Sequence, residues 1–148
     1  MAGFKFGLET LLNHRLHHEE TIQKELAVCE HRLRDEKSVL NQMLLDKNKA
    51  IQEIHQNQLQ GIIISEHVVY ANFLEGMDRN LTIQNEKINE SEKKFVEKRD
   101  ELIEAVKKRK TLEKLKEKGF AAYSRNMLKL EQEFMDEVAI SHFNKETL

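Results

Sequence analysis

Apolar residues recur every seven positions along the first part of the chain. They form two neighbouring lines, as in the seam of a coiled coil. One line comprises Leu12, Leu26, Leu33, Leu40 and Ile54, and the other comprises Ile22, Cys29, Met43 and Ala50. Charged residues interrupt this seam at Arg15, Glu19, Glu36 and Lys47, so we expect it to be of modest stability. The pattern predicts a first helix over about residues 8–58.

The stretch Gly61-Ile62-Ile63-Ile64-Ser65 is the clearest break between two helical patterns. Gly61 suits the left-handed conformation that ends a helix, because it has no Cβ. Ser65 suits the N-cap of a following helix, and Glu66 suits the positive end of that helix dipole. These residues predict a bend over about 59–65. One continuous helix through this stretch is the alternative.

The second helix is predicted over about residues 66–144. Its apolar line comprises Leu74, Leu81, Ile88, Phe95 and Leu102, with Met77 and Ala105 beside it. The spacing from Leu112 to Phe120 is eight residues, so we expect the apolar stripe to rotate near Gly119. The last apolar residues, which we name the C-terminal stripe, are Phe120, Tyr123, Met127, Leu130 and Phe134.

The two helices are predicted to differ in length, at roughly 75 Å and 120 Å for a rise of about 1.5 Å per residue. Antiparallel pairing would therefore use up the first helix near residue 116. The C-terminal stripe must then fold back, protrude or become buried in another protein, and an exposed apolar stripe typically marks an interface. The sequence predicts an all-α fold in which residues 1–148 form a single antiparallel two-helix coiled-coil domain.

Composition agrees with an elongated helical body. Charged residues make up 34% of the chain and hydrophobic residues 39%, and there is no proline or tryptophan. The formal net charge of −2 argues against a dedicated nucleic-acid binder. A single cysteine cannot form an internal disulfide, and no stretch approaches the ~20 apolar residues that span a bilayer. We therefore expect a cytoplasmic protein without membrane insertion.

The sequence contains no catalytic motif, such as a Gly-rich phosphate loop, a nucleophile elbow or a zinc-binding His-Glu-x-x-His helix. His14, His17 and His18 share a helix face, but no further ligand set accompanies them, so we interpret them as solvated. Cys29 lies in the seam, where a thiol behaves as a small apolar side chain. We expect no enzymatic activity, no cofactor and no metal.

Positive charge is concentrated between residues 107 and 118. The run comprises Lys107, Lys108, Arg109, Lys110, Lys114, Lys116 and Lys118, with Glu113 and Glu117 among them. A solvated helix face is the first interpretation. Contact with an acidic protein surface and binding of nucleic acid are the alternatives.

Three patterns along the chain together resemble the FliJ proteins of the flagellar type III export apparatus. They are the opening Phe4-x-Phe6-x-Leu8-x-x-Leu11-Leu12-x-x-Arg15, the bend region Gly61-Ile62 with Tyr70-x-x-Phe73-Leu74, and the close Met135-Asp136-Glu137-x-Ala139-x-x-x-Phe143. The resemblance covers essentially the whole chain. It implies a non-enzymatic antiparallel coiled coil similar to the central stalk of rotary ATPases.

The resemblance also implies partners and contact residues. FliJ-like proteins insert into the hexameric ring of the export ATPase FliI, contact the membrane export gate FlhA, and in some cases handle substrate chaperones. By position, the residues implied at the ring are Leu8, Leu11, Leu12, Arg15, Phe120, Tyr123, Met127, Leu130, Phe134 and Phe143. Those implied at the gate are Phe73, Met77, Asn80, Gln84, Val39, Met43, Asp46 and Ala50.

The function expected from this resemblance is flagellar protein export at the cytoplasmic face of the cell membrane. A coiled-coil stalk of a related virulence secretion system is one alternative. A nucleic-acid-binding helical protein that uses Lys107–Lys118 is another, and a steep loss of binding with salt would distinguish it.

Overall fold

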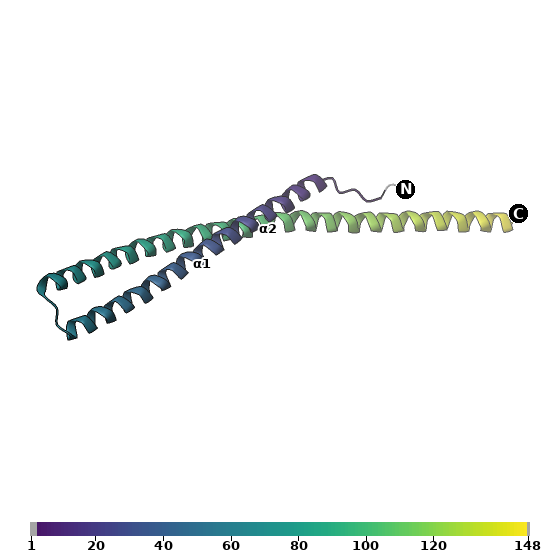
Figure 1. The fold of residues 1–148 in the computed structure, drawn as a ribbon. Helices are drawn as coiled ribbons and strands as arrows, with labels where there is room; N and C mark the ends of the chain where they lie inside the picture. The colour runs from purple at the N-terminus through teal and green to yellow at the C-terminus, as the bar shows by residue number, and fades with distance from the viewer. Residues whose placement is uncertain (1–2, 148) are drawn as a thin grey trace. The chain divides into compact units, whose positions relative to one another are not determined.

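The structure is a computed structural model and describes residues 3–147. It contains two helices packed against each other, α1 (Glu9–Leu59, 51 residues) and α2 (Ile64–Glu146, 83 residues), and no strand within the described residues (Figure 1). This confirms the predicted all-α two-helix hairpin. Met1, Ala2 and Leu148 of the predicted 1–148 domain lie outside the described residues.

The bend between the helices is built on a left-handed glycine. Gly61 has φ +90°, and its N–H donates to the Gln58 carbonyl (3.1 Å) as α1 ends. One continuous helix is therefore excluded. The interpretation of Ser65 as the N-cap is wrong, because α2 begins at Ile64 and Ser65 lies within its first turn. The carbonyl that accepts from the His67 N–H (3.2 Å) belongs to Ile63.

Replacing Gly61 with alanine is expected to destabilise the protein by about 1 kcal/mol, because a Cβ is disfavoured at positive φ. Gly76 is the matched control. It lies inside α2, and a Cβ there would meet only Arg79 at 3.7 Å, so Gly76→Ala should stabilise the protein by about 0.5–1 kcal/mol. Urea unfolding measures both. A stabilising Gly61→Ala would contradict the glycine's role at the bend.

By packing, the described chain divides into two compact units. The first joins the residues up to Glu20 with those from Ile103 onward, and the second comprises Thr21–Leu102. Both helices contribute to both units.

In the second unit the predicted seam lines face each other, with Ile22, Ile54 and Ile88 buried. Most other seam residues are half-buried: Leu26, Cys29, Leu33, Leu40, Met43, Ala50, Leu74, Met77, Leu81, Phe95 and Leu102. The two charged seam residues on this part of α1 bind across to α2. Lys47 pairs with Asp78, and Gln84 Nε2 donates to Glu36 Oε2 (2.6 Å). The pairing is antiparallel, because rising numbers on α1 meet falling numbers on α2.

In the first unit Leu12, Ala105 and Leu112 are buried. The predicted end of helix pairing near residue 116 is confirmed, because Glu9, the first residue of α1, bonds to Lys116. The apolar stripe shifts near Gly119 as predicted, because Phe120 lies off the packed face, but the packed face itself does not rotate. Less exposed positions continue at heptad spacing through Arg109, Lys116 and Tyr123, while Phe120 lies exposed beside them. A pattern of apolar residues alone does not predict this continuation, because Arg109 and Lys116 are cations that pair with glutamates.

Candidate functional site

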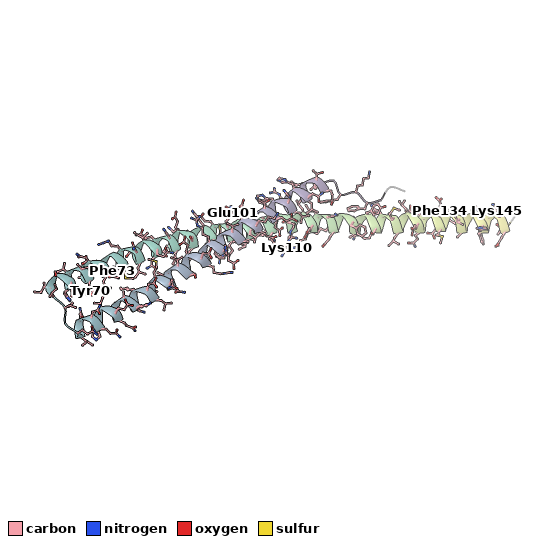
Figure 2. The ribbon with its side chains drawn as sticks, viewed as in Figure 1. Tyr70, Phe73, Glu101, Lys110, Phe134 and Lys145 are labelled. Carbon is pink, nitrogen blue, oxygen red and sulfur yellow. The ribbon has the colours of Figure 1, made fainter. Side chains whose placement is uncertain are left out.

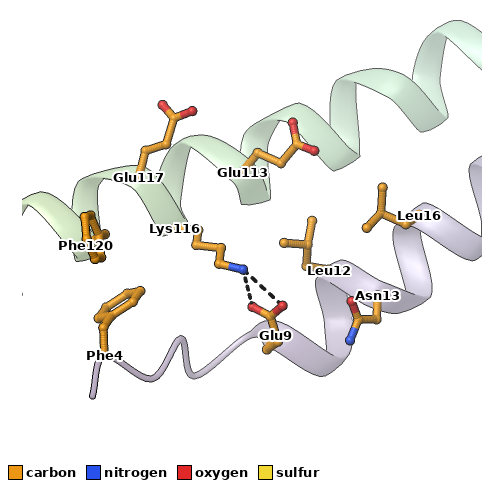
Figure 3. Close-up of a pocket in the computed structure, with 9 residues that line it drawn as sticks. All are labelled: Phe4, Glu9, Leu12, Asn13, Leu16, Glu113, Lys116, Glu117 and Phe120. Atoms are coloured by element: carbon orange, nitrogen blue, oxygen red, sulfur yellow. Dashed lines mark hydrogen bonds and ion pairs between the residues drawn. The ribbon is translucent and has the colours of Figure 1, made fainter. Parts of the chain in front are cut away.

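The end of the first unit is a shallow, mixed surface around the start of α1. A pocket of about 470 Å³ lies there, with apolar walls that include Phe4, Leu12, Leu16 and Phe120 (Figure 3). Inside it Lys116 Nζ lies 2.9 Å from Glu9 Oε2 (Figure 3). The pocket therefore has an apolar lining, and the charges of Lys116 and Glu9 inside it are already paired. These properties suit an apolar side chain of a protein partner.

The segment before α1 extends the packed surface beyond the end of the helix pair. The ring of Phe4 lies edge-on to Phe120, with centroids 5.6 Å apart, and tilted against Tyr123 at 5.7 Å. Gly119 makes room for it, since a Cβ at this position would stand 3.3 Å from the Phe4 ring. Each aromatic contact of this kind contributes on the order of 1 kcal/mol. The N-terminal segment thus covers the first two residues of the C-terminal stripe in part.

A charged cluster lies next to this end, at a seam position. Arg109 binds Glu19 across the helix pair and Glu113 on its own helix at 2.8 Å. Hydrogen bonding to Glu19, and secondarily to Glu113, raises the pKa of the Arg109 guanidinium above its ordinary value. Arg109 therefore stays charged at any physiological pH and keeps the buried Glu19 partnered.

Beyond Met127, α2 is uncovered. Every described residue from 128 to 147 is exposed, and Phe134 is 65% exposed although it is a large aromatic (Figure 2). The large apolar side chains exposed along this part are Leu128, Leu130, Phe134, Met135, Val138, Ile140 and Phe143. Because α2 remains one helix to Glu146, this end does not fold back on itself.

The residues implied at the ring all lie in the first unit, in different environments. Leu8, Leu11, Phe120, Leu130, Phe134 and Phe143 are exposed, and Arg15, Tyr123 and Met127 are half-buried. Leu12 is only 4% exposed and belongs to the core between the helices. It also lines the pocket beside Phe4, so a partner can reach only a small part of this side chain.

The residues implied at the gate all lie in the second unit. Phe73, Asn80, Val39 and Asp46 are exposed, and Met77, Met43 and Ala50 are half-buried seam residues. Gln84 is 5% exposed and donates to Glu36, so it bridges the two helices instead of facing outward. Phe73 and Asn80 are the gate residues on α2 that are exposed.

Sequence reasoning left Phe4 out of the candidate set, although the structure places it against Phe120 and Tyr123. Residues before α1 carry no helical periodicity, so their packing could not be assigned from the pattern. The available signal was Gly119, because a glycine on the packed face of a helix leaves room for another segment to come close.

The structure gives little support to two other candidate sites, the basic run and the three histidines. Three members of the basic run, Lys107, Arg109 and Lys116, bind glutamates within the protein. His14, His17 and His18 are exposed, and within residues 3–147 no group of three or more His, Cys, Asp or Glu could hold a metal ion. Over the same range, neither helix has a stretch long and apolar enough to cross a membrane.

Comparison with known proteins identifies the family. The family model described as "Flagellar FliJ protein" matches residues 4–148, almost the entire chain. Comparisons with curated proteins and with solved structures gave no match. The match agrees with the resemblance carried by the opening, bend and closing patterns. The chain therefore belongs to the flagellar FliJ protein family and is a flagellar export-associated protein.

Proposed function

We propose that this chain is a non-enzymatic stalk of the flagellar export machine, which binds the hexameric export ATPase FliI through its first unit. The observation that carries this proposal is the uncovered part of α2, residues 128–147, where aromatic and aliphatic side chains face solvent. Burial of this surface in a partner stabilises the complex by roughly 25 cal/mol per Å² of apolar area. The pocket beside Phe4 and Phe120 extends the same binding surface.

The second unit is proposed to contact the export gate FlhA, with Phe73 as its main exposed residue. Figure 2 shows Phe73 and Tyr70 near the bend. Gln84 and Leu12 are not proposed as main contact residues, because both are largely buried between the helices. Substrate chaperones are a third proposed class of partner. Membership in the flagellar family favours this apparatus over a virulence secretion system. The proposed location is peripheral, at the cytoplasmic face of the membrane.

Two substitutions test the two contacts against each other. Phe134→Ala is expected to weaken binding to the FliI ring about tenfold, equivalent to about 1.4 kcal/mol, and to leave binding to the cytoplasmic part of FlhA unchanged. Phe73→Ala is expected to weaken binding to FlhA about tenfold and to leave binding to the FliI ring unchanged. Each variant is the control for the other, because both replace an exposed phenylalanine on α2. Biolayer interferometry with each purified partner gives the four affinities.

Circular dichroism melts of the same variants check that the fold is intact. Little change in melting temperature is expected, because both side chains are more than half exposed. Unchanged affinity of Phe134→Ala for the ring, with a large fall in melting temperature, would show that this side chain is structural and would reject the proposed ring surface.

A further inference from the structure

The region around the bend is nearly free of fixed charge. Between Ile54 and Leu74 the only Asp, Glu, Lys or Arg is Glu66, in a chain of which 34% is charged. The two side-chain bonds that join the helices here likewise involve no Asp, Glu, Lys or Arg. Asn57 Nδ2 donates to Tyr70 Oη (3.1 Å), and Gln58 Nε2 lies 3.3 Å from His67 Nδ1. These bonds link the end of α1 to the start of α2 across the bend.

Large apolar side chains remain exposed on this charge-poor region. We name them the apolar tip: Leu59, Ile63, Ile64, Val68, Val69 and Phe73, each more than half exposed. Ile64 reaches 86% exposure. A soluble surface rarely gathers this many large apolar side chains unless something covers them. No other segment within residues 3–147 covers these side chains, so the occupant comes from a partner molecule.

The same turns of α2 also carry a hollow. A depression of about 250 Å³ is lined by Ser65, Glu66, Val69 and Tyr70. Ile64 and Val68, one turn apart, project from the neighbouring face of the helix. A protrusion and a hollow therefore lie side by side on one surface. Such an arrangement permits two-fold pairing, in which the protrusion of each copy enters the hollow of the other.

We propose that the apolar tip binds the apolar tip of a second copy of this chain. Ile64 of one copy enters the hollow beside Val69 and Tyr70 of the other. Two-fold pairing brings identical residues near one another, so a surface rich in charge would repel itself. The apolar tip contributes only Glu66 to such repulsion. The proposal goes beyond the ring and gate contacts. It shares Phe73 with the proposed gate contact, so one copy can use Phe73 for only one of the two contacts at a time.

A bilayer is a less suitable occupant. The backbone between α1 and α2 is not helical, and unpaired N–H and C=O groups are costly in hydrocarbon. The fixed charges nearest the apolar tip are Glu53, Glu66 and Glu75, which anionic lipid headgroups repel.

Sedimentation velocity of the full chain over a range of micromolar concentrations tests the proposal. The wild type should show a reversible monomer–dimer equilibrium. Ile64→Glu should raise the dissociation constant roughly a hundredfold, because pairing would bury a carboxylate twice per dimer. Glu66→Gln should lower it several-fold by removing the repulsion. Val28→Glu, exposed in the same unit but far along α1, and Phe134→Glu should both leave it unchanged.

A cysteine placed at the contact locates the interface. Ser65→Cys in a Cys29→Ser background should form a disulfide-linked dimer under mild oxidation, while Ser141→Cys in the same background should not. A wild type that is monomeric throughout would overturn the proposal. So would a dimer that Phe134→Glu disrupts and Ile64→Glu does not. Binding of a monomeric wild type to phosphatidylcholine vesicles, lost in Ile64→Glu, would overturn it in favour of lipid.

Discussion

Replacing Arg109 with leucine is expected to lower the free energy of unfolding by about 3 kcal/mol, the cost of leaving a buried carboxylate without its partner. Glu19 is 8% exposed and bonds to Arg109 across the helix pair. The lower end of the usual range applies because water still reaches the Arg109 side chain in part. Urea unfolding followed by circular dichroism gives the value. A two-helix protein with this loss should be substantially unfolded at physiological temperature.

The double variant Glu19→Leu/Arg109→Leu is the informative companion. It removes both charges and leaves two apolar side chains at facing seam positions, so its stability should return to the wild-type value or exceed it. Arg34→Leu is the surface control, since its bond to Glu30 is exposed and contributes at most about 0.5 kcal/mol. If the double variant is as unstable as Arg109→Leu, the loss does not come from an unpaired Glu19.

Leu112→Ala is expected to destabilise the protein by about 2–4 kcal/mol, because it removes buried methyl groups and leaves a cavity in a small core. Leu112 is 8% exposed and lies between the helices of the first unit. Few other apolar side chains of the first unit are equally buried, so the remaining core can replace little of the packing that Leu112→Ala removes.

Leu128→Ala is the matched control, because it makes the same chemical change on the same helix at a residue that is 65% exposed. It should cost less than about 0.5 kcal/mol. Equal losses in the two leucine variants would show that residues beyond Met127 pack against the protein in solution, contrary to their exposure in the structure.

The heptad pattern predicted both helices, and the glycine at position 61 predicted the bend and with it the antiparallel pairing, because each of these depends on local sequence. The partners of the charged seam residues could not be predicted. Glu36 and Lys47 were read as interruptions, and their bonds to Gln84 and Asp78 depend on how the helices align. Periodicity predicts on which face of its helix a residue lies, but it does not predict which residue of the other helix it contacts.

The resemblance and the heptad pattern disagree at two of the candidate contact residues. Leu12 lies on the first seam line, and Gln84 lies at heptad spacing from Met77, so both belong between the helices by spacing alone. Positions carried over from the family placed them at partner surfaces, and the structure buries both. For Leu12 and Gln84, the periodic pattern is the better guide to exposure.

The bonded polar pairs between the helices also determine which alternative alignments of the hairpin are possible. An apolar seam tolerates sliding by one heptad, because every apolar residue then meets another. In the second unit, sliding one way would move Lys98 from its partner Glu25 to a position opposite Arg32, a like charge. Sliding the other way would place the carboxylate of Glu36 opposite Met77, which has no side-chain hydrogen-bond donor. The polar pairs thus select one alignment by penalising its competitors, and contribute little to stability in the aligned state.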